Sequence, residues 1–472
     1  MSDSHVVTPG RDMRERSAHA VADPTLQAAL RNLDRRLHTA RAVQEEHADW
    51  KDRAAAVRRE ALADLEGLLG HLEARLRSLG VEVHHAPTAA DARAIVLDIA
   101  RRHGATRVAK SKSMATEEIA LGAALEADGR AVVETDLGEY IVQLAGERPS
   151  HMITPAIHKT LAQIRDVLSA EAGEELALTR EDLTAWARAR LRNEFLAADL
   201  GVTGVNFAAA DTGTLVLVTN EGNGRLCTTL PSVHVAVMGI EKVIPRLSDL
   251  GVLLPLLTRS ATGQQLSNYV TMITGPRRRD ERDGPDELHV VILDNHRRSL
   301  MGTKYEDMLA CIRCGACLNV CPVYRHVSGH AYDSVYSGPM GKVLTPLLSA
   351  GAEGRDLPHG STLCGACNDA CPVQIPLADM LVELRADLRA PGPVLPVRRP
   401  ARGRPRGMGL AAWSRAWSTP AGYRATTALA RAASRVLPGR RWARLGLPRW
   451  TRSRDLPLPA PETFRARWAR ER

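Results

Sequence analysis

Seven of the eight cysteines lie between Cys311 and Cys371, and their spacing constrains the fold more than any other feature of the sequence. The first run, residues 311–322, has the spacing C-x2-C-x2-C-x3-C-P, which binds [4Fe-4S] clusters. The second run, residues 361–372, repeats it 50 positions later but begins with Ser361 instead of cysteine. Such local and irregular spacing is not that of a secreted disulfide framework. The sequence therefore predicts a segment that folds around metal centres.

The ligands are assigned by analogy with two-cluster ferredoxins, in which the last cysteine of each run binds the other run's cluster. The crossed assignment is Cys311, Cys314, Cys317 and Cys371 for cluster 1, and Cys321, Cys364 and Cys367 for cluster 2. We expect cluster 1 to be [4Fe-4S]. Because Ser361 stands where cluster 2 would have its fourth thiolate, two types stay open for it: [3Fe-4S], or [4Fe-4S] with an oxygen, water or partner ligand.

Zinc is the alternative metal, since four-cysteine zinc modules also use C-x2-C pairs. A tetrahedral zinc site takes two separated pairs of cysteines. This chain instead has three closely spaced cysteines, a more distant Cys-Pro, and a near-repeat of both, which favours iron-sulfur clusters. Such clusters pass one electron at a time, at potentials set by charge, hydrogen bonds and exposure. We therefore expect an electron relay, with the charge of Arg313 raising the potential of cluster 1.

The composition is that of a globular protein. The chain has 472 residues, 44% hydrophobic and 25% charged, which excludes wholesale disorder and allows about three domains. No apolar run approaches the roughly 18 to 20 residues of a membrane-spanning helix. No secretory signal is visible in the polar first residues, so we expect a cytoplasmic location.

Four regions are predicted along the chain. Residues 1–80 are expected to form a polar arm, up to residue 23, followed by a helical hairpin. Residues 81–300 alternate β-rich and helical stretches, which is typical of a mostly parallel sheet covered on both faces. Residues 301–390 form the iron-sulfur domain, and 391–472 a proline linker with an Arg/Trp-rich basic region. The predicted strands are 81–83, 107–109, 131–133, 151–153, 203–209, 214–218, 233–238, 268–273 and 288–293.

The basic region carries the positive charge of the whole chain. Residues 398–472 contain 19 Arg, no Lys and three acidic residues. Arginine in this number could bind nucleic acid or an anionic membrane surface. We expect no nucleic acid and favour docking to an acidic partner, with peripheral membrane contact as the alternative. The tryptophans that would then lie at the headgroups are Trp413, Trp417, Trp442, Trp450 and Trp468.

The motifs together resemble the lactate utilization protein B family. The resemblance is carried by the two cysteine runs, by Gly338-Pro-Met-Gly341 and by Lys110-Ser-Lys-Ser-Met114, Asp211-Thr-Gly-Thr214 and Thr219-Asn-Glu-Gly-Asn-Gly-Arg225. It extends over about residues 25–390, and the basic region matches only in being basic and tryptophan-bearing.

This resemblance implies the iron-sulfur subunit of a bacterial complex that oxidises L-lactate to pyruvate. It implies a ribose-phosphate isomerase/CoA-transferase-like α/β domain followed by a helical, ferredoxin-like two-cluster domain. It also implies two partner subunits, one with cysteine-rich repeats and one sharing the α/β domain. Another 2-hydroxy acid such as glycolate is an alternative substrate of the complex.

Weaker signals lie in the α/β region. Glu221 with the glycines of residues 222–225 could form an active site of a CoA-transferase-like enzyme with redox-sensing clusters, but a hairpin turn explains the glycines equally well. Lys110 and Lys112 follow a predicted strand, where open α/β sheets bind ligands, although a solvated loop is also expected there. Cys227 is expected to be a small buried apolar residue. No G-x-G-x-x-G motif follows a strand, so a Rossmann-type flavin or nicotinamide site is not supported, and no catalytic or cofactor-binding residue is assigned.

Overall fold

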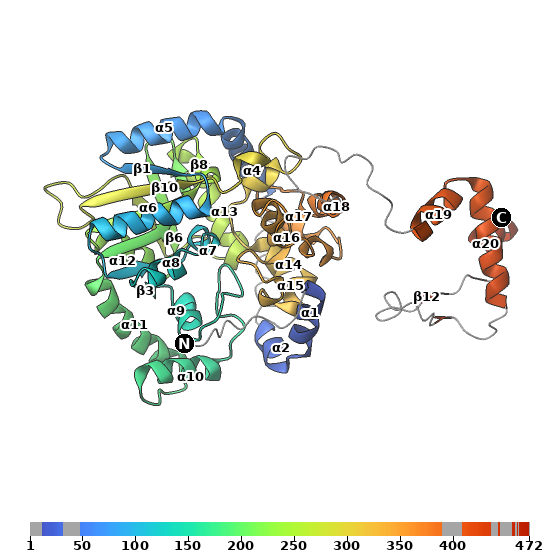
Figure 1. Ribbon diagram of the computed structural model, residues 1–472, viewed down its shortest axis with the longest axis horizontal. Coiled ribbons are helices and arrows are strands. Elements are labelled where there is room, and N and C mark those ends of the chain that lie inside the picture. Colours follow the sequence, from blue (N-terminus) through green and yellow to red (C-terminus); the bar gives the residue numbers. More distant parts are fainter. Residues whose placement is uncertain are drawn as a thin grey trace. The chain divides into compact units, whose positions relative to one another are not determined.

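The computed structural model describes residues 12–31, 48–388, 408–435, 442–443, 456–457, 460 and 462–471. The chain divides into two compact units, residues 1–398 and residues 399–472 (Figure 1). No helix within the described ranges has both the length and the apolar character needed to cross a membrane.

A six-stranded sheet forms the centre of the α/β part, and every pair of neighbouring strands is parallel. Its order is β1 (Glu82–Ala86), β10 (Glu287–Leu293), β7 (Val233–Gly239), β4 (Leu200–Gly204), β2 (Arg107–Lys110) and β3 (Ala131–Glu134). The predicted mostly parallel α/β sheet is confirmed. Buried apolar residues run along both faces of β7, because parallel strands are covered on both sides.

Helices cover the two faces of this sheet (Figure 1). Along β7, Val235 and Val237 pack on the face covered by α6, while Ala236 and Met238 pack on the face covered by α5. The helices of this part are α5 (Leu65–Ser78), α6 (Ala89–Arg102), α7 (Met114–Glu118), α8 (Leu121–Ala127), α9 (Leu137–Leu144), α10 (Leu161–Ala172), α11 (Arg180–Ala197), α12 (Asn223–Thr229) and α13 (Leu250–Thr262). Helix α6 begins at a capping box formed by Thr88 and Asp91, a local signal for the start of a helix.

A second sheet joins the α/β part to the cysteine region. Its order is β8 (Val243–Ile244), β5 (Phe207–Ala209), β6 (Thr214–Thr219) and β9 (Tyr269–Ile273). Ala208 faces the core under α5, whereas Phe207 and Ala209 belong to the core that contains the cysteines. The predicted strand 151–153 is wrong, because these residues form a bent loop in which His151 Nδ1 accepts the Ile153 backbone N–H at 2.9 Å.

The cysteine region contains only helices among its described residues. They are η3 (Arg298–Leu300), η4 (Glu306–Ala310), α14 (Ala316–Val320), α15 (Pro322–Val327), η5 (His330–Tyr332), α16 (Gly338–Leu348), η6 (Leu357–His359), α17 (Ala366–Ala370) and α18 (Leu377–Asp387). Two further 3-10 turns, η1 (Ile240–Lys242) and η2 (Leu247–Asp249), lie beside β8 in the α/β part.

The N-terminal helices also pack against the cysteine region. They are α1 (Met13–Ala22), α2 (Pro24–Leu30) and α4 (Ala48–Ala63), and residues 32–47 of the predicted hairpin lie outside the described residues. The predicted polar arm is wrong over residues 13–22, because Arg16 donates to the Ala331 carbonyl at 2.9 Å and holds α1 there. The fully buried Arg58 donates to the carbonyls of Ala310 and Val243 and ties α4 to both regions.

The second unit is described by itself. It contains α19 (Met408–Trp417), α20 (Pro420–Arg435), α21 (Phe464–Glu471) and the antiparallel pair β11 (Trp442–Ala443) and β12 (Leu456–Pro457). Trp413, Trp417 and Trp468 are between 43% and 51% exposed. Trp450 and the side chain of Trp442 lie outside the described residues.

Candidate metal centre

The two cysteine runs have the same backbone conformation. Gly315 and Gly365 precede α14 and α17 with φ of +75° and +80°, and Arg313 and Leu363 have φ of +60° and +55°. Both short helices end at a cysteine in extended conformation, Cys321 or Cys371. A left-handed conformation at two corresponding non-glycine residues is unusual enough to require support from the surrounding structure. The sequence repeat is thus also a structural repeat, and α14 packs against α17.

In both Cys-Pro elements the cysteine sulfur accepts a backbone N–H. The Sγ atom of Cys321 accepts the Tyr324 backbone N–H at 3.5 Å, and the Sγ atom of Cys371 accepts the Ile375 backbone N–H at 3.3 Å. Hydrogen bonds to cysteine sulfur stabilise negative charge there and tune the potential of a bound cluster.

The four cysteines predicted for cluster 1 line one cavity. Cys311, Cys314 and Cys317 come from the first run, and Cys371 reaches the same cavity from the second. The apolar side chains of Met152, Ile312, Met340, Ile375 and Leu377 complete the wall. Burial raises the pKa of the Cys371 thiol to about 11 and the pKa of Cys314 further still, so that these sulfurs need a bound cation to lose their protons.

The three cysteines predicted for cluster 2 lie nearer the surface. Cys321 and Cys367 are buried, but Cys364 is exposed. Burial, together with the nearby sulfurs of Cys321 and Cys364, raises the pKa of Cys367 to about 11. Ser361 accepts the Leu363 backbone N–H at 3.2 Å within its own loop.

Lys342 is a buried cation beside this second set. It lies on α16 with no exposed surface, and its Nζ is 3.8 Å from Cys321 Sγ and 5.4 Å from the Tyr332 ring. No carboxylate pairs with it among the described residues. Burial lowers the pKa of Lys342, whereas the sulfurs of Cys321 and Cys367 oppose this shift. An anionic iron-sulfur cluster held by these cysteines would supply the missing counter-charge, so the residues present fit such a group.

The distances between sulfurs also bear on zinc. Zn–S bonds of about 2.3 Å place four tetrahedral thiolates about 3.8 Å apart. Over the described residues, which include all seven clustered cysteines, no three of these sulfurs lie within 4.8 Å of one another. This wider spacing suits a multinuclear cluster better than a single zinc ion.

Arg313 is held by a buried network of charges. Its Nη2 lies 3.3 Å from Glu241, which also pairs with Arg297 at 2.7 Å, and Arg297 pairs with Glu118 at 2.7 Å. Burial opposes ionisation of Glu241, but Arg297, Lys242 and Arg313 lower its pKa to about 2. The network fixes the first cysteine loop on the α/β part.

A larger cavity of about 340 Å³ adjoins the cluster 1 cavity. It lies at the carboxyl ends of parallel strands, since Ser111 follows β2, Asn206 follows β4 and Arg297 follows β10. Met152 and Arg313 line both cavities and separate them.

Some residues predicted for a ligand cleft lie in this larger cavity and others do not. Lys112 and Glu221 line it, whereas Lys110 is buried in ion pairs of 2.6 Å with Glu117 and Glu134. Burial and the nearby Asp136 raise the pKa of Glu221. Residues 222–225 do not form a hairpin turn, because Gly222, with φ of +75°, begins helix α12.

Cys227 is fully buried, as expected. Its Sγ lies 3.4 Å from Thr135 Oγ1, and burial raises the pKa of its thiol to about 12. It lines neither the cluster 1 cavity nor the 340 Å³ cavity.

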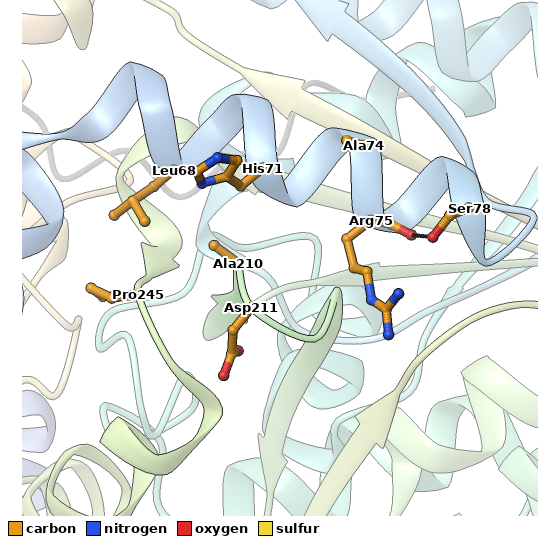
Figure 2. A pocket seen from close by; sticks show the side chains of 8 residues that line it. All are labelled: Leu68, His71, Ala74, Arg75, Ser78, Ala210, Asp211 and Pro245. Atoms are coloured by element: carbon orange, nitrogen blue, oxygen red, sulfur yellow. Dashed lines mark hydrogen bonds between the residues drawn. The ribbon is translucent and has the colours of Figure 1, made fainter.

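A separate depression lies between α5 and the loops after β5 and β8 (Figure 2). Arg75 and Asp211 lie on opposite sides of it, and Ser78 donates to the Arg75 carbonyl at 2.7 Å. None of the residues predicted to bind a metal or a ligand lines it.

Lys342 and the Glu241 network were not predicted from the sequence. The available signal for Lys342 was a lone charge within the otherwise apolar stretch of residues 338–348. Nothing in the sequence marks Glu241, Arg297 and Arg313 as neighbours, because they lie on three separate segments.

The comparisons with known protein families match three successive parts of the chain. The family "LUD domain" matches residues 69–293, and "4Fe-4S dicluster domain" matches residues 307–375. The cysteine region is therefore an iron-sulfur domain. "Lactate utilisation protein B, C-terminal" matches residues 403–472. The expectation that the basic region matches the family only in its charge and tryptophans is therefore wrong, because its sequence matches a family model of its own.

Similar proteins match over nearly the whole chain. Two proteins named "Lactate utilization protein B", from Oceanobacillus iheyensis and Bacillus subtilis, are each 41% identical, covering 97% and 96% of this chain and 95% of each relative. The Escherichia coli "Uncharacterized electron transport protein YkgF" is 44% identical over 80% of this chain and 81% of its own length. The chain therefore belongs to the lactate utilization protein B family.

Proposed function

We propose that this chain is the iron-sulfur electron-transfer subunit of a complex that oxidises L-lactate to pyruvate. The observation that carries the proposal is the crossed arrangement of two cysteine runs, in which Cys371 lines the cavity formed by the first run. The names of the relatives supply the substrate. When bound at these thiolates, iron-sulfur clusters accept and release single electrons.

We propose the predicted ligand sets without change. Cys311, Cys314, Cys317 and Cys371 hold a [4Fe-4S] cluster, and Cys321, Cys364 and Cys367 hold a second cluster, either [4Fe-4S] or [3Fe-4S]. The burial of Cys314, Cys317 and Cys371 in the first set and the lone charge of Lys342 beside the second support this assignment.

The arrangement also suggests how the subunit is connected. The cluster 1 thiolates lie behind Arg313 and Met152, next to the 340 Å³ cavity. Among the cluster 2 thiolates, Cys364 is exposed at the surface. A partner that exchanges electrons would dock on the surface around Cys364, because a partner bound there would be nearest to the cluster 2 thiolates. We propose that partners with cysteine-rich repeats and with a related α/β domain complete the complex.

We propose a cytoplasmic location. The exposed tryptophans and arginines of residues 399–472 are consistent with docking to an acidic partner or with peripheral contact to an anionic membrane.

Two alternatives have less support. A glycolate-oxidising complex would use the same relay, and only the partner that handles the acid would differ. In a CoA-transferase-like enzyme Glu221 would be essential. Its Oε2 instead accepts the Leu137 backbone N–H at 3.0 Å, so Glu221→Gln is expected to leave electron transfer intact.

The decisive experiment is anaerobic purification followed by iron and sulfide analysis and EPR of the oxidised and reduced protein. Two cubanes correspond to about eight irons per chain, and one cubane with a [3Fe-4S] cluster to about seven. Colourless protein that contains zinc at the cysteines would refute the proposal.

A further inference from the structure

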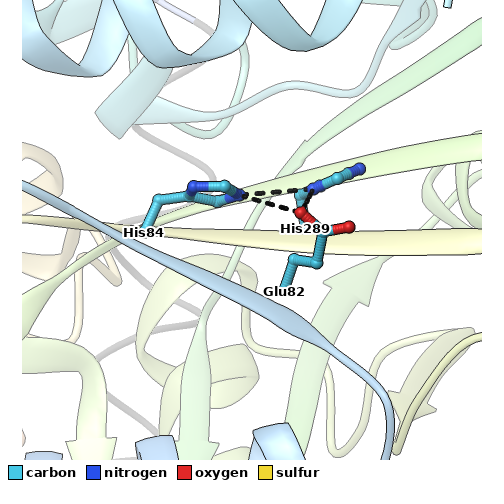
Figure 3. Close-up of side chains that lie close together, drawn as sticks. All are labelled: Glu82, His84 and His289. Carbon is cyan, nitrogen blue, oxygen red and sulfur yellow. Dashed lines mark hydrogen bonds and ion pairs between the residues drawn. The ribbon is translucent and has the colours of Figure 1, made fainter.

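Two histidines and a glutamate converge on neighbouring strands away from the cysteines (Figure 3). Glu82 and His84 lie on the edge strand β1, and His289 lies on β10, paired in register with Glu82. His84 Nε2 is 3.2 Å from His289 Nδ1, and Glu82 Oε2 is 3.3 Å and 3.9 Å from His289 and His84. Three potential ligand atoms thus face one point.

Two of these three distances are close to those of a zinc coordination sphere, and the third, 3.9 Å between Glu82 and His84, is somewhat longer. Zn–N and Zn–O bonds of about 2.0 to 2.2 Å place the ligand atoms of a tetrahedron about 3.3 to 3.6 Å apart. Imidazole nitrogen and carboxylate oxygen are common zinc ligands, and three protein ligands leave a fourth position for water.

The other side of His289 also faces a carboxylate. Its Nε2 lies 3.4 Å from Glu287 Oε2, without the alignment of a hydrogen bond, and His103 contacts the same carboxylate at 3.2 Å. Metal-binding histidines usually donate their second N–H to a carboxylate.

The hydrogen-bond count of His289 points the same way. Carboxylates face both of its nitrogens, but a neutral ring has only one N–H. The ring is fully buried. A cation at Nδ1 would leave the single N–H at Nε2, on the side of Glu287.

We propose that Glu82, His84 and His289 bind a zinc ion, with Glu287 orienting His289. The ion would link the edge strand β1 to β10. Glu82 is half-exposed, which gives the ion access from solvent. The site is formed by the beginnings of both strands, at the edge of the sheet opposite the 340 Å³ cavity, so it is independent of the iron-sulfur function.

The test uses the full chain with its clusters, loaded with ZnSO4 and freed of excess metal. The variants are His84→Gln and Glu82→Gln, and the matched control is His85→Gln. His85 is the next residue on β1, but it points to the opposite face and pairs with Glu73 at 2.9 Å. Zinc and iron are measured per chain, and the thermal midpoint is recorded with and without zinc.

Wild type and His85→Gln are expected to hold one more zinc per chain than His84→Gln and to melt at a higher temperature when zinc is present. Zinc at the cysteines would be equal in all variants and cancels in this comparison. Glu82→Gln changes a half-exposed side chain, so it tests the site even if His84→Gln folds poorly. Equal zinc content in wild type and Glu82→Gln, or the same loss in His85→Gln, would overturn the proposal.

Discussion

Lys342 offers the sharpest test of the cluster 2 assignment. Lys342→Met keeps most of the side-chain volume and removes a buried charge that has no carboxylate partner among the described residues. The reduction potential of cluster 2 should fall, because the reduced cluster carries one more negative charge, which Lys342 stabilises.

The size of the effect follows from the distance of 3.8 Å between Lys342 Nζ and Cys321 Sγ. With an effective dielectric constant of about 20, a full charge on this sulfur is attracted by about 4 kcal/mol. The added electron spreads over the cluster, at roughly twice this distance, which leaves about 2 kcal/mol. Since 59 mV corresponds to about 1.4 kcal/mol for one electron, the potential should fall on the order of 100 mV.

The assay is an anaerobic redox titration followed by EPR, with iron content measured on the same sample. Lys304→Met is the matched control, because Lys304 lies in the same domain but pairs with Asp387 at 3.0 Å. The control should leave both potentials unchanged. An unchanged cluster 2 potential in Lys342→Met at full iron content would refute the assignment, and so would an equal shift of both clusters.

Three further outcomes are expected. Cys371→Ser should degrade the EPR signal of cluster 1 and Cys321→Ser that of cluster 2, and the reverse pattern would exclude crossed ligation. Glu241→Gln should destabilise the anaerobic protein to denaturant by about 3 kcal/mol, because it unpairs buried arginines, whereas Glu60→Gln at an exposed pair should cost less than about 1 kcal/mol. Because the pKa of Glu241 is lowered from 4.5 to about 2, its contribution to the free energy of unfolding is complete above pH 4.5 and should decline as the pH falls below that value. A stability difference between wild type and Glu241→Gln that stays constant from pH 5 to pH 3 would contradict the ion pair. Deleting residues 398–472 should leave the iron content unchanged. If the basic region contacts membranes, the deletion should also abolish sedimentation of the chain with anionic vesicles. Equal pelleting of the shortened and full chains would exclude that contact.

Local signals predicted most of the α/β part. The start of α6 is marked by its capping box at Thr88, and the strands β7 and β10 follow from short apolar runs. The loop at 151–153 shows the limit of such signals. Met152 and Ile153 are apolar because they line cavities, and not because they form a strand.

The helix α1 shows the converse case. Its residues are polar enough to resemble a solvated arm, yet Arg16 is buried against Ala331, more than 300 residues away in the sequence. No local pattern contains that contact.

The spacing of the cysteines by itself predicted an iron-sulfur domain and, by analogy with two-cluster ferredoxins, the crossed ligand sets that we propose. The tertiary structure decided the surroundings: Cys364 at the surface, Lys342 without a counter-charge, and Arg313 between two cavities. It also brought His84 beside His289, which are 205 residues apart, through the pairing of β1 with β10. Burial and charge proximity arise when distant segments pack together, and a linear pattern records only near neighbours.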